Sequence, residues 1–432
     1  MSIEWLSLAI AIAIVVLMML GVPLAFVTGS IAVVVALTMF GASGLTVVAS
    51  QVFSLVNEYL FVAVPMFLLM ATFLERSGVA HDLYDAMNAL GRRVRGGVAL
   101  QTLAVAVVLA TTTGIVGGEV VLLGVIALPQ MLRLGYDRKL AIGTICAGGA
   151  LGAMIPPSIV LIVYGITASV SVGDLFTAAF LPGFLMAALY ALYIVARCRL
   201  DPAMAPLPSS EALAAAGGGE ALRKVALPLA LVAAVLGSIY GGVASITEAA
   251  AVGAFGALLC AWQRGRLSFA LMRDAALQTM RTCGMVLWLT FGAAALIGVY
   301  GLVGGTRFAG GLLSGLDLPP LAVVAVMMAV VFLLGMVMDW IGICLLTMPI
   351  FVPVVKALGL DPIWFGVLFC MNVQVAYLSP PFGPAAFFLK GVAPPDISLQ
   401  EIFRAVLPFI GLQIVALGLV MLFPGIALWA VR

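Results

Sequence analysis

Apolar segments long enough to cross a bilayer recur along the whole chain and restrict it to the folds that a membrane accepts. A spanning helix needs about 17–25 apolar residues, because hydrocarbon offers the backbone no hydrogen-bond partner. Here 64% of the residues are hydrophobic and 9% are charged, against roughly 25% charged residues in soluble domains. The alternation with a period of two that is typical of a membrane β-barrel is missing. We therefore expect an all-α polytopic membrane protein.

Adjacent prolines interrupt two of these segments, at Pro156-Pro157 and Pro380-Pro381, which lie 224 positions apart. Between residues 129 and 157, the same offset gives seven identities in 29 ungapped positions, whereas chance gives about two at average composition. We therefore expect two structural repeats, residues 1–198 and 224–432. The Pro-, Ala- and Gly-rich segment 199–223 between them is flanked by Arg and Lys, which predicts a cytoplasmic linker.

One segment in each repeat, 97–132 and 318–356, does not have the pattern of a single crossing. Basic residues flank 97–132 on both sides, which places both of its ends in the cytoplasm. Its middle, "TTTGIVGG", suits a tight turn, so we favour a re-entrant hairpin over two ordinary spans. Segment 318–356 has few basic neighbours and fits the periplasmic side. One hairpin from each face indicates inverted repeats, an arrangement found in secondary transporters.

The other apolar segments are expected to span the membrane, the first of them as a retained helix rather than a signal peptide. The expected spans are 4–19, 23–40, 59–75, 140–168, 175–196, 225–243, 246–262, 282–302, 362–389 and 405–429. Two stretches of mixed polarity, 42–57 and 265–280, again correspond at the offset of 224. We interpret them as interfacial amphipathic arms, with plain loops as the alternative.

The proline pairs are expected to break 140–168 and 362–389 into half-helices. The first half-helix should end near Gly152, leaving carbonyls that suit a cation, and the second should begin near Pro157 with Ser158, leaving amides that suit an anion. Ser379, before Pro380 and Pro381, is expected to cap its half-helix in the same way. The two breaks and the two hairpin tips would then form a pocket for an anion and Na⁺, whereas a kink without a ligand is the alternative.

Polar residues inside spans are costly and usually functional. Asp339 lies at the expected tip of the second hairpin, and Asn372 and Gln374 precede the second break. Glu119 lies beside the first turn and either belongs to the site or only pairs with a polar neighbour. Glu248 is either a site residue or a cap of the helix that follows it.

Other classes of function find little support in the sequence. The chain has one histidine and no GxxxxGK[ST] stretch, so neither a Ser/His/Asp site nor ATP hydrolysis is expected. A net charge of +2 does not suggest a nucleic-acid partner, and the six scattered cysteines suggest neither a disulfide framework nor a metal cluster. An integral-membrane enzyme would need convergent His, Asp or Glu clusters, which the sequence does not show.

The stretches "GTICAGGALGAMIPPSIVLIVYG", "SVGDLFTAAFLPG", "ITEAAAVGA" and "NVQVAYLSPPFG" resemble the large membrane subunit, of DctM type, of tripartite ATP-independent periplasmic (TRAP) transporters. The resemblance covers essentially the whole chain. It implies Na⁺-driven uptake of a small organic anion, such as a carboxylate, across the bacterial inner membrane by an elevator-like movement. It also implies two partners in addition to membrane lipid: a small four-helix membrane subunit and a periplasmic substrate-binding protein. No cofactor is implied, and Na⁺ is the coupling ion.

The chain departs from this family at the first hairpin tip. Many members carry Ser-Gly-Ser-Ser there, whereas this chain has Thr113, Gly114, Ile115 and Val116. An ion ligand at this tip must therefore come from Thr113 or from backbone carbonyls, such as that of Gly114. The remaining alternative is a stand-alone Na⁺/carboxylate transporter with similar inverted hairpins, and the requirement for a binding protein distinguishes the two.

Overall fold

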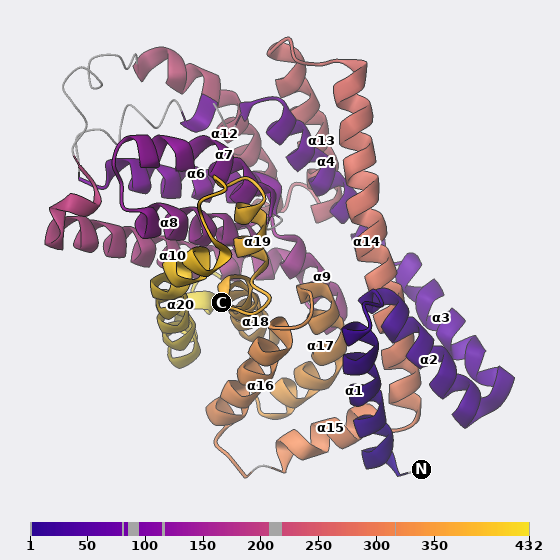
Figure 1. Cartoon of the computed structure of the whole chain (residues 1–432). Coiled ribbons are helices and arrows are strands. Elements are labelled where there is room, and N and C mark those ends of the chain that lie inside the picture. Colours follow the sequence, from indigo (N-terminus) through magenta and orange to yellow (C-terminus); the bar gives the residue numbers. More distant parts are fainter. Residues whose placement is uncertain are drawn as a thin grey trace.

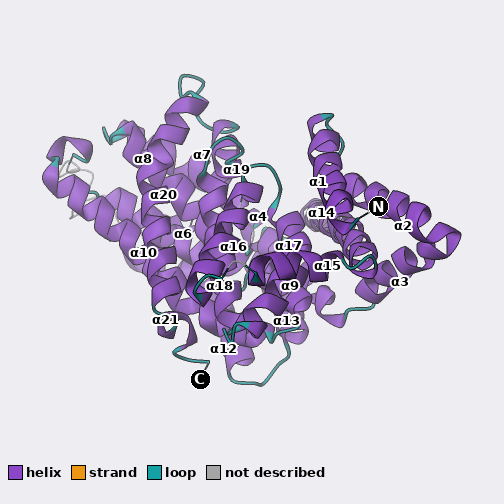
Figure 2. Ribbon diagram, turned by 90° about the horizontal axis from the view of Figure 1, so that it is seen from below, coloured by secondary structure: helices purple, strands orange, loops and turns teal. Residues whose placement is uncertain are grey.

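The computed structural model describes residues 2–79, 82–84, 95–114, 117–206, 218–315 and 317–431, and every regular element in these ranges is helical (Figure 2). The helices of the first half are α1 Ile3–Met19, α2 Leu24–Phe40, α3 Gly44–Val56, α4 Ala63–Arg76, α6 Gly97–Thr113, α7 Gly118–Arg133, α8 Arg138–Ala150, α9 Ile159–Ala168 and α10 Val172–Leu200. Short 3₁₀ turns are η1 Gly41–Ser43, η2 Tyr59–Val62, η3 Leu151–Ala153 and η4 Pro202–Met204.

The helices of the second half lie between Gly218 and Leu428. They are α12 Gly218–Tyr240, α13 Ile246–Gln263, α14 Phe269–Leu302, α15 Gly305–Ser314, α16 Pro320–Gly335, α17 Trp340–Ala357, α18 Pro362–Leu378, α19 Pro384–Lys390, α20 Leu399–Leu422 and α21 Gly425–Leu428. Among the described residues, seven helices are long and apolar enough to cross a membrane. The chain is therefore a multi-pass membrane protein.

The residues that the two halves share at the offset of 224 have the same local roles. Asp137 and Asp361 are the N-caps of α8 and α18, where their carboxylates accept hydrogen bonds from the amides of Leu140 and Ile363. Gly135 and Gly359 follow α7 and α17 with positive φ angles of 77° and 71°, a conformation that glycine adopts without strain. The shared residues therefore specify where one helix ends and the next begins.

Several expected boundaries are wrong in detail. The stretch 265–280 is not a separate arm, because α14 runs without a break through it and through the expected span 282–302. The expected linker 199–223 overlaps the end of α10 and the start of α12, while its residues 207–217 lie outside the described residues. The expected span 405–429 is two helices, α20 and α21, and α15 was not expected.

The helices form two groups by their contacts, and Figures 1 and 2 show α1–α3 and α14 of the first group to one side of the molecule. The outer helices are α1–α4 and α12–α15, in which α4 packs on α13 and α14 packs on α2 and α3. The hairpin helices are α6–α10 and α16–α21, in which α8 packs on α7 and α20, and α18 on α16 and α20. Contacts of α14 and α15 with α17, and of α4 with α6, join the two groups.

The short half-helices pack crosswise between the two halves of the chain. Helix α9 of the first half packs on α17 of the second half, while α19 of the second half packs on α7 and α8 of the first. On the outside, Arg138 is ion-paired with Asp396, and the hydrogen bond from Arg138 lowers the pKa of Asp396 below its ordinary value. The hairpin helices of both halves therefore share one core.

Candidate functional site

The tip of the first hairpin, between α6 and α7, packs directly on the first break. Gly114 has a φ angle of +60°, and a Cβ built on it would come within 2.5 Å of the carbonyl oxygen of Pro157. The Ile159 amide donates to the Gly114 carbonyl at 3.4 Å. Thr113 is the last residue of α6, and Ile115 and Val116 lie outside the described residues. The structure thus brings Gly114 and Pro157 together, as the sequence predicted for a hairpin tip and a break.

Glu119 lies at the same contact between the first hairpin tip and the first break. It is in the first turn of α7, its side chain is fully buried, and a Cβ on Gly152 would lie 2.9 Å from its carboxyl carbon. Gly152 is in the 3₁₀ turn η3, where the first half-helix ends. A buried carboxylate therefore lies against the carbonyl end of α8, where a cation would be stabilised both by the carboxylate and by the helix dipole.

Ser158, rather than Pro157, marks the start of the second half-helix. Helix α9 begins at Ile159 with Ser158 as its N-cap, two residues after Pro157. The Ser158 hydroxyl donates to the Ala153 carbonyl at 2.5 Å and accepts from the Leu161 amide at 3.5 Å. Its oxygen holds the two sides of the break together, and at the start of α9 the Ile159 amide is bonded to Gly114 and the Leu161 amide to Ser158.

The second break is built differently. Ser379 is the C-cap of α18, and its hydroxyl donates to the Val375 carbonyl at 2.7 Å. The expectation that Ser379 caps the following half-helix is therefore wrong, because α19 begins at Pro384 with Gly383 as its N-cap and no side-chain cap. Pro381 lies in the non-helical segment between the two half-helices.

Asp339 caps the second hairpin at its tip, where its carboxylate accepts from the Ile341 amide at 3.2 Å. Beside it lies a void of about 10 Å³, roughly the space of one water molecule or one dehydrated ion. The void is lined by Gly335, Met338, Asp339, Trp340, Ile343, Val373, Ala376, Tyr377, Phe382 and Pro384. The tip of the second hairpin thus lies against the second break, with one carboxylate at the contact.

The two amides of α18 have different surroundings. Asn372 is 2% exposed, and its amide donates to the Met328 carbonyl of α16 at 2.6 Å, so it anchors the second hairpin. Gln374 is fully buried, and neither its oxygen nor its nitrogen has a hydrogen-bond partner among the described residues. An unpaired amide inside a protein costs about 1–3 kcal/mol. Of the two, Gln374 is the amide still open to a ligand.

The second half of the chain also touches the first break. The Cys370 thiol on α18, one turn before Gln374, donates to the Ala153 carbonyl at 2.8 Å. The first break therefore faces the body of α18 rather than the second break itself.

Glu248 is not part of this arrangement. It is exposed in the first turn of α13 and forms a capping box with Ser245, whose amide donates to its carboxylate at 2.7 Å. Of the two alternatives for Glu248, the structure shows the helix cap.

Sequence reasoning missed a polar cavity between the two helix groups. It has a volume of about 180 Å³ and is lined by Leu68, Ala71, Thr72, Glu75, Gly118, Gln278, Thr279 and Thr282. Glu75 is the last residue of an expected span and is followed by Arg76. Charged residues at such a position usually only face solvent, so the sequence did not mark Glu75 as a site residue. The signal that could have found it is the hydroxyl-rich face of Thr279 and Thr282 on the helix opposite.

Comparison with known proteins gives consistent results along the whole chain. The family model described as "Tripartite ATP-independent periplasmic transporter, DctM component" matches residues 11–426. The C4-dicarboxylate TRAP transporter large permease protein DctM of Pseudomonas aeruginosa is 31% identical over 393 residues, which cover 90% of each chain. The ectoine TRAP transporter large permease protein TeaC of Halomonas elongata is 27% identical, with 96% of each chain covered.

Two solved structures share the fold at low sequence identity. The YdaH transporter of Alcanivorax borkumensis aligns with a TM-score of 0.62 and 15% identity, over 92% of this chain and 96% of that chain. MtrF of Neisseria gonorrhoeae aligns with a TM-score of 0.66 and 14% identity, over 90% and 85% of the two chains. At this identity the likeness concerns the fold alone.

Proposed function

This chain belongs to the DctM family of tripartite ATP-independent periplasmic transporters, and from that premise we propose that it imports a small organic anion together with Na⁺. As a large permease subunit it is a transporter component of the bacterial inner membrane and not an enzyme. Its relatives are named for C4-dicarboxylates and for ectoine. Both kinds of substrate carry a carboxylate, so we propose a substrate with at least one carboxylate.

The observation that carries this proposal is that each hairpin tip lies against a proline-broken helix. Gly114 contacts Pro157 in the first half, and Asp339 and Pro384 line one void in the second. Half-helix C-termini offer carbonyls to Na⁺, while half-helix N-termini offer amides to a carboxylate. We propose that the two halves are inverted repeats, since their helices correspond at one offset, and that the hairpin helices move past the outer helices as in an elevator.

We propose separate roles for the residues at the breaks. Na⁺ is held by backbone carbonyls at Thr113, Gly114 and Gly152, with Glu119 close by, and at the second hairpin by Asp339 and Gln374. The substrate carboxylate is held at the helix ends that follow the breaks. This second set comprises Pro157 and Ser158, which precede α9, and Ser379 and Pro381, which follow the body of α18 at the second break, with Asn372 fixing the second hairpin in position.

We further propose that the chain works with two partners. A periplasmic binding protein delivers the substrate, and a small membrane subunit packs on the apolar surface of the outer helices. We propose that the subunit covers α2 and α3 in place of lipid, where the exposed apolar side chains include Phe26, Val34 and Phe53 at 56%, 57% and 72% exposure.

The test is uptake into liposomes with an inward Na⁺ gradient. The purified chain alone should give no uptake of a radiolabelled carboxylate such as succinate or ectoine. Adding the small subunit and the binding protein should start uptake, and an ionophore that collapses the Na⁺ gradient should stop it. Uptake by the chain alone, driven by Na⁺ without a binding protein, would instead support a stand-alone Na⁺/carboxylate transporter.

A further inference from the structure

The cavity of about 180 Å³ lies where the two helix groups meet. Glu75 is on α4 and Thr279 on α14, which are outer helices, whereas Gly118 is the first residue of α7, a hairpin helix. A Cβ on Gly118 would lie 3.8 Å from the nearer carboxylate oxygen of Glu75. A molecule in this cavity would therefore touch both groups at once.

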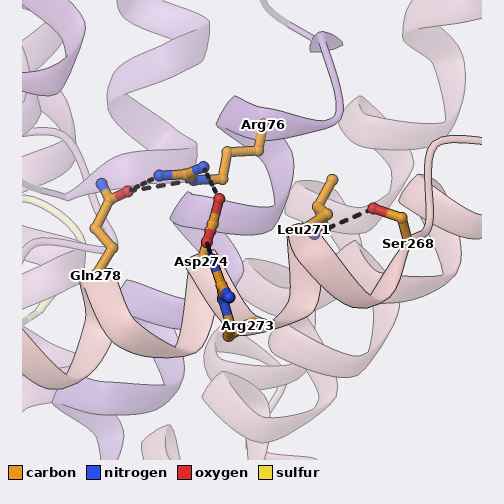
Figure 3. A network of polar contacts seen from close by, with 6 residues as sticks. All are labelled: Arg76, Ser268, Leu271, Arg273, Asp274 and Gln278. Carbon is orange, nitrogen blue, oxygen red and sulfur yellow. Dashed lines mark hydrogen bonds and ion pairs between the residues drawn. The ribbon is translucent and has the colours of Figure 1, made fainter.

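Glu75 lines the cavity with a partly buried carboxylate. It has no hydrogen-bond or ion-pair partner among the described residues. Its neighbour Arg76 is committed elsewhere: its guanidinium donates to the Gln278 side chain at 2.9 and 3.3 Å and pairs with Asp274 at 3.5 Å (Figure 3). Arg76 thus ties α4 to α14 beside the cavity and leaves the Glu75 carboxylate available to a ligand.

Thr279 is a second polar group without a partner. Its side chain is 8% exposed, it lines the cavity, and its hydroxyl oxygen makes no hydrogen bond with the described residues. A buried hydroxyl without a partner is uncommon in folded proteins. A carboxylate and an unpaired hydroxyl that face one space form an acceptor-rich wall, which suits a ligand that donates hydrogen bonds.

The size of the cavity argues against a bare alkali ion as its occupant. Its volume of about 180 Å³ is far larger than the void of about 10 Å³ beside Asp339, which has roughly the space of one water molecule. A single ion would be too small to bridge its walls, while an organic molecule of several heavy atoms fits.

We propose that this cavity is a substrate subsite in which Glu75 binds the cationic group of a small zwitterion, with Thr279 as a further hydrogen-bond partner. This inference rests on the proposed transport function and narrows its substrate class. A zwitterion places its ammonium or amidinium group at Glu75. A dianion without a cationic group would bring two like charges together at Glu75 and is disfavoured.

The experiment is ligand binding to the purified full-length chain, measured by calorimetry and thermal shift. The probes are ectoine, β-alanine, taurine and proline as zwitterions, succinate as the dianion, and NaCl against KCl as the ion alone. We expect the chain to bind at least one zwitterion more tightly than succinate. Glu75→Gln should weaken that binding roughly 10- to 100-fold, the contribution of a charge-assisted hydrogen bond, and Thr279→Val should weaken it less.

Asp174→Asn is the matched control, because it removes an exposed carboxylate that does not line the cavity, and it should bind zwitterions nearly as the native chain does. Glu75→Asp keeps the charge with a shorter reach and serves if Glu75→Gln does not fold; it should bind with intermediate affinity. Three outcomes overturn the proposal: no zwitterion binds, zwitterion binding is unchanged in Glu75→Gln and Glu75→Asp, or Na⁺ alone gives the Glu75-dependent shift. Binding needs neither an ion gradient nor a partner protein, so failure here leaves Na⁺-driven uptake intact, and failed uptake leaves this binding in place.

Discussion

Gly114 and the Pro157 carbonyl are in such close contact that no other residue fits at the tip of the first hairpin without displacing the backbone. The contact joins a turn between α6 and α7 to the break between α8 and α9. Gly114 also has a left-handed φ angle of +60°. Both the space and the backbone conformation therefore require glycine there.

Gly114→Ala is expected to destabilise the protein and abolish uptake. A left-handed backbone costs an alanine roughly 1–2 kcal/mol, and here the Pro157 carbonyl must also move. Gly242→Ala is the control, since Gly242 has a φ angle of +64° but nothing within 4 Å of a built Cβ. Thermal unfolding and uptake measure both variants. Equal losses in the two would mean that the contact with Pro157 contributes nothing.

Gln374→Met is expected to stabilise the ligand-free protein and remove its response to Na⁺. The free energy of unfolding should rise by about 1 kcal/mol, because an unpaired buried amide is replaced by an apolar side chain of similar shape. Ligand binding stabilises the folded state, so a lost Na⁺ ligand should also remove the increase in melting temperature that NaCl gives over KCl.

The control for Gln374→Met is Asn372→Leu, two positions before it on the same helix. Its amide donates to Met328, so this variant should lose about 1 kcal/mol of stability and keep its Na⁺ response. A normal Na⁺ response in Gln374→Met would remove Gln374 from the ion site.

Single cysteines in a background without native cysteines should report an inverted topology. Cysteines at positions 95 and 138 are expected to react with an impermeant thiol reagent from the cytoplasm, and one at 361 from the periplasm, as the flanking charges indicate. A cysteine at 396 should react from the same side as one at 138, since Arg138 and Asp396 are ion-paired. Labelling of positions 95 and 361 from one side contradicts the inverted repeats.

Cross-linking Leu24→Cys on α2 to Gly342→Cys on α17, two positions in direct contact, with a short bifunctional thiol reagent should stop uptake, and cleaving the linker should restore it. This pair joins an outer helix to a hairpin helix, so it prevents the movement of one group past the other. The control pair, Arg76→Cys and Gln278→Cys, joins two outer helices that are already hydrogen-bonded and should leave uptake intact. Full uptake with the first pair cross-linked would rule out this movement.

The apolar runs predicted an all-helical multi-pass membrane protein, because a bilayer requires long apolar helices. The expected hairpin 97–132 is α6 and α7, which run from Gly97 to Arg133, and the expected broken helix 362–389 is α18 and α19, from Pro362 to Lys390. The arm 265–280 was misjudged because nothing in its composition shows whether a helix continues. A helix of 34 residues is about 51 Å long, so α14 extends well beyond a hydrocarbon core of about 30 Å.

The candidate site was predictable only in part. The glycine, proline and serine residues at the breaks could be recognised from their spacing in the sequence. Hydrogen bonding is not visible in the sequence: Ser379 bonds back to Val375, and Asn372 bonds to Met328, whereas Gln374 has no partner among the described residues. The same holds for Glu75, whose importance depends on a cavity wall from α14 far along the chain.

The crosswise packing of the half-helices has a consequence for biosynthesis. During translation, α9 enters the membrane before its neighbour α17, and the glycine-rich faces of α7 and α8 enter before α19. The first half therefore cannot complete its packing until the chain has been synthesised beyond residue 390. Until then, lipid covers the surfaces that α17 and α19 later contact. A chain that ended at the linker would lack those neighbours. We expect a quality-control protease to degrade it as an incompletely folded protein.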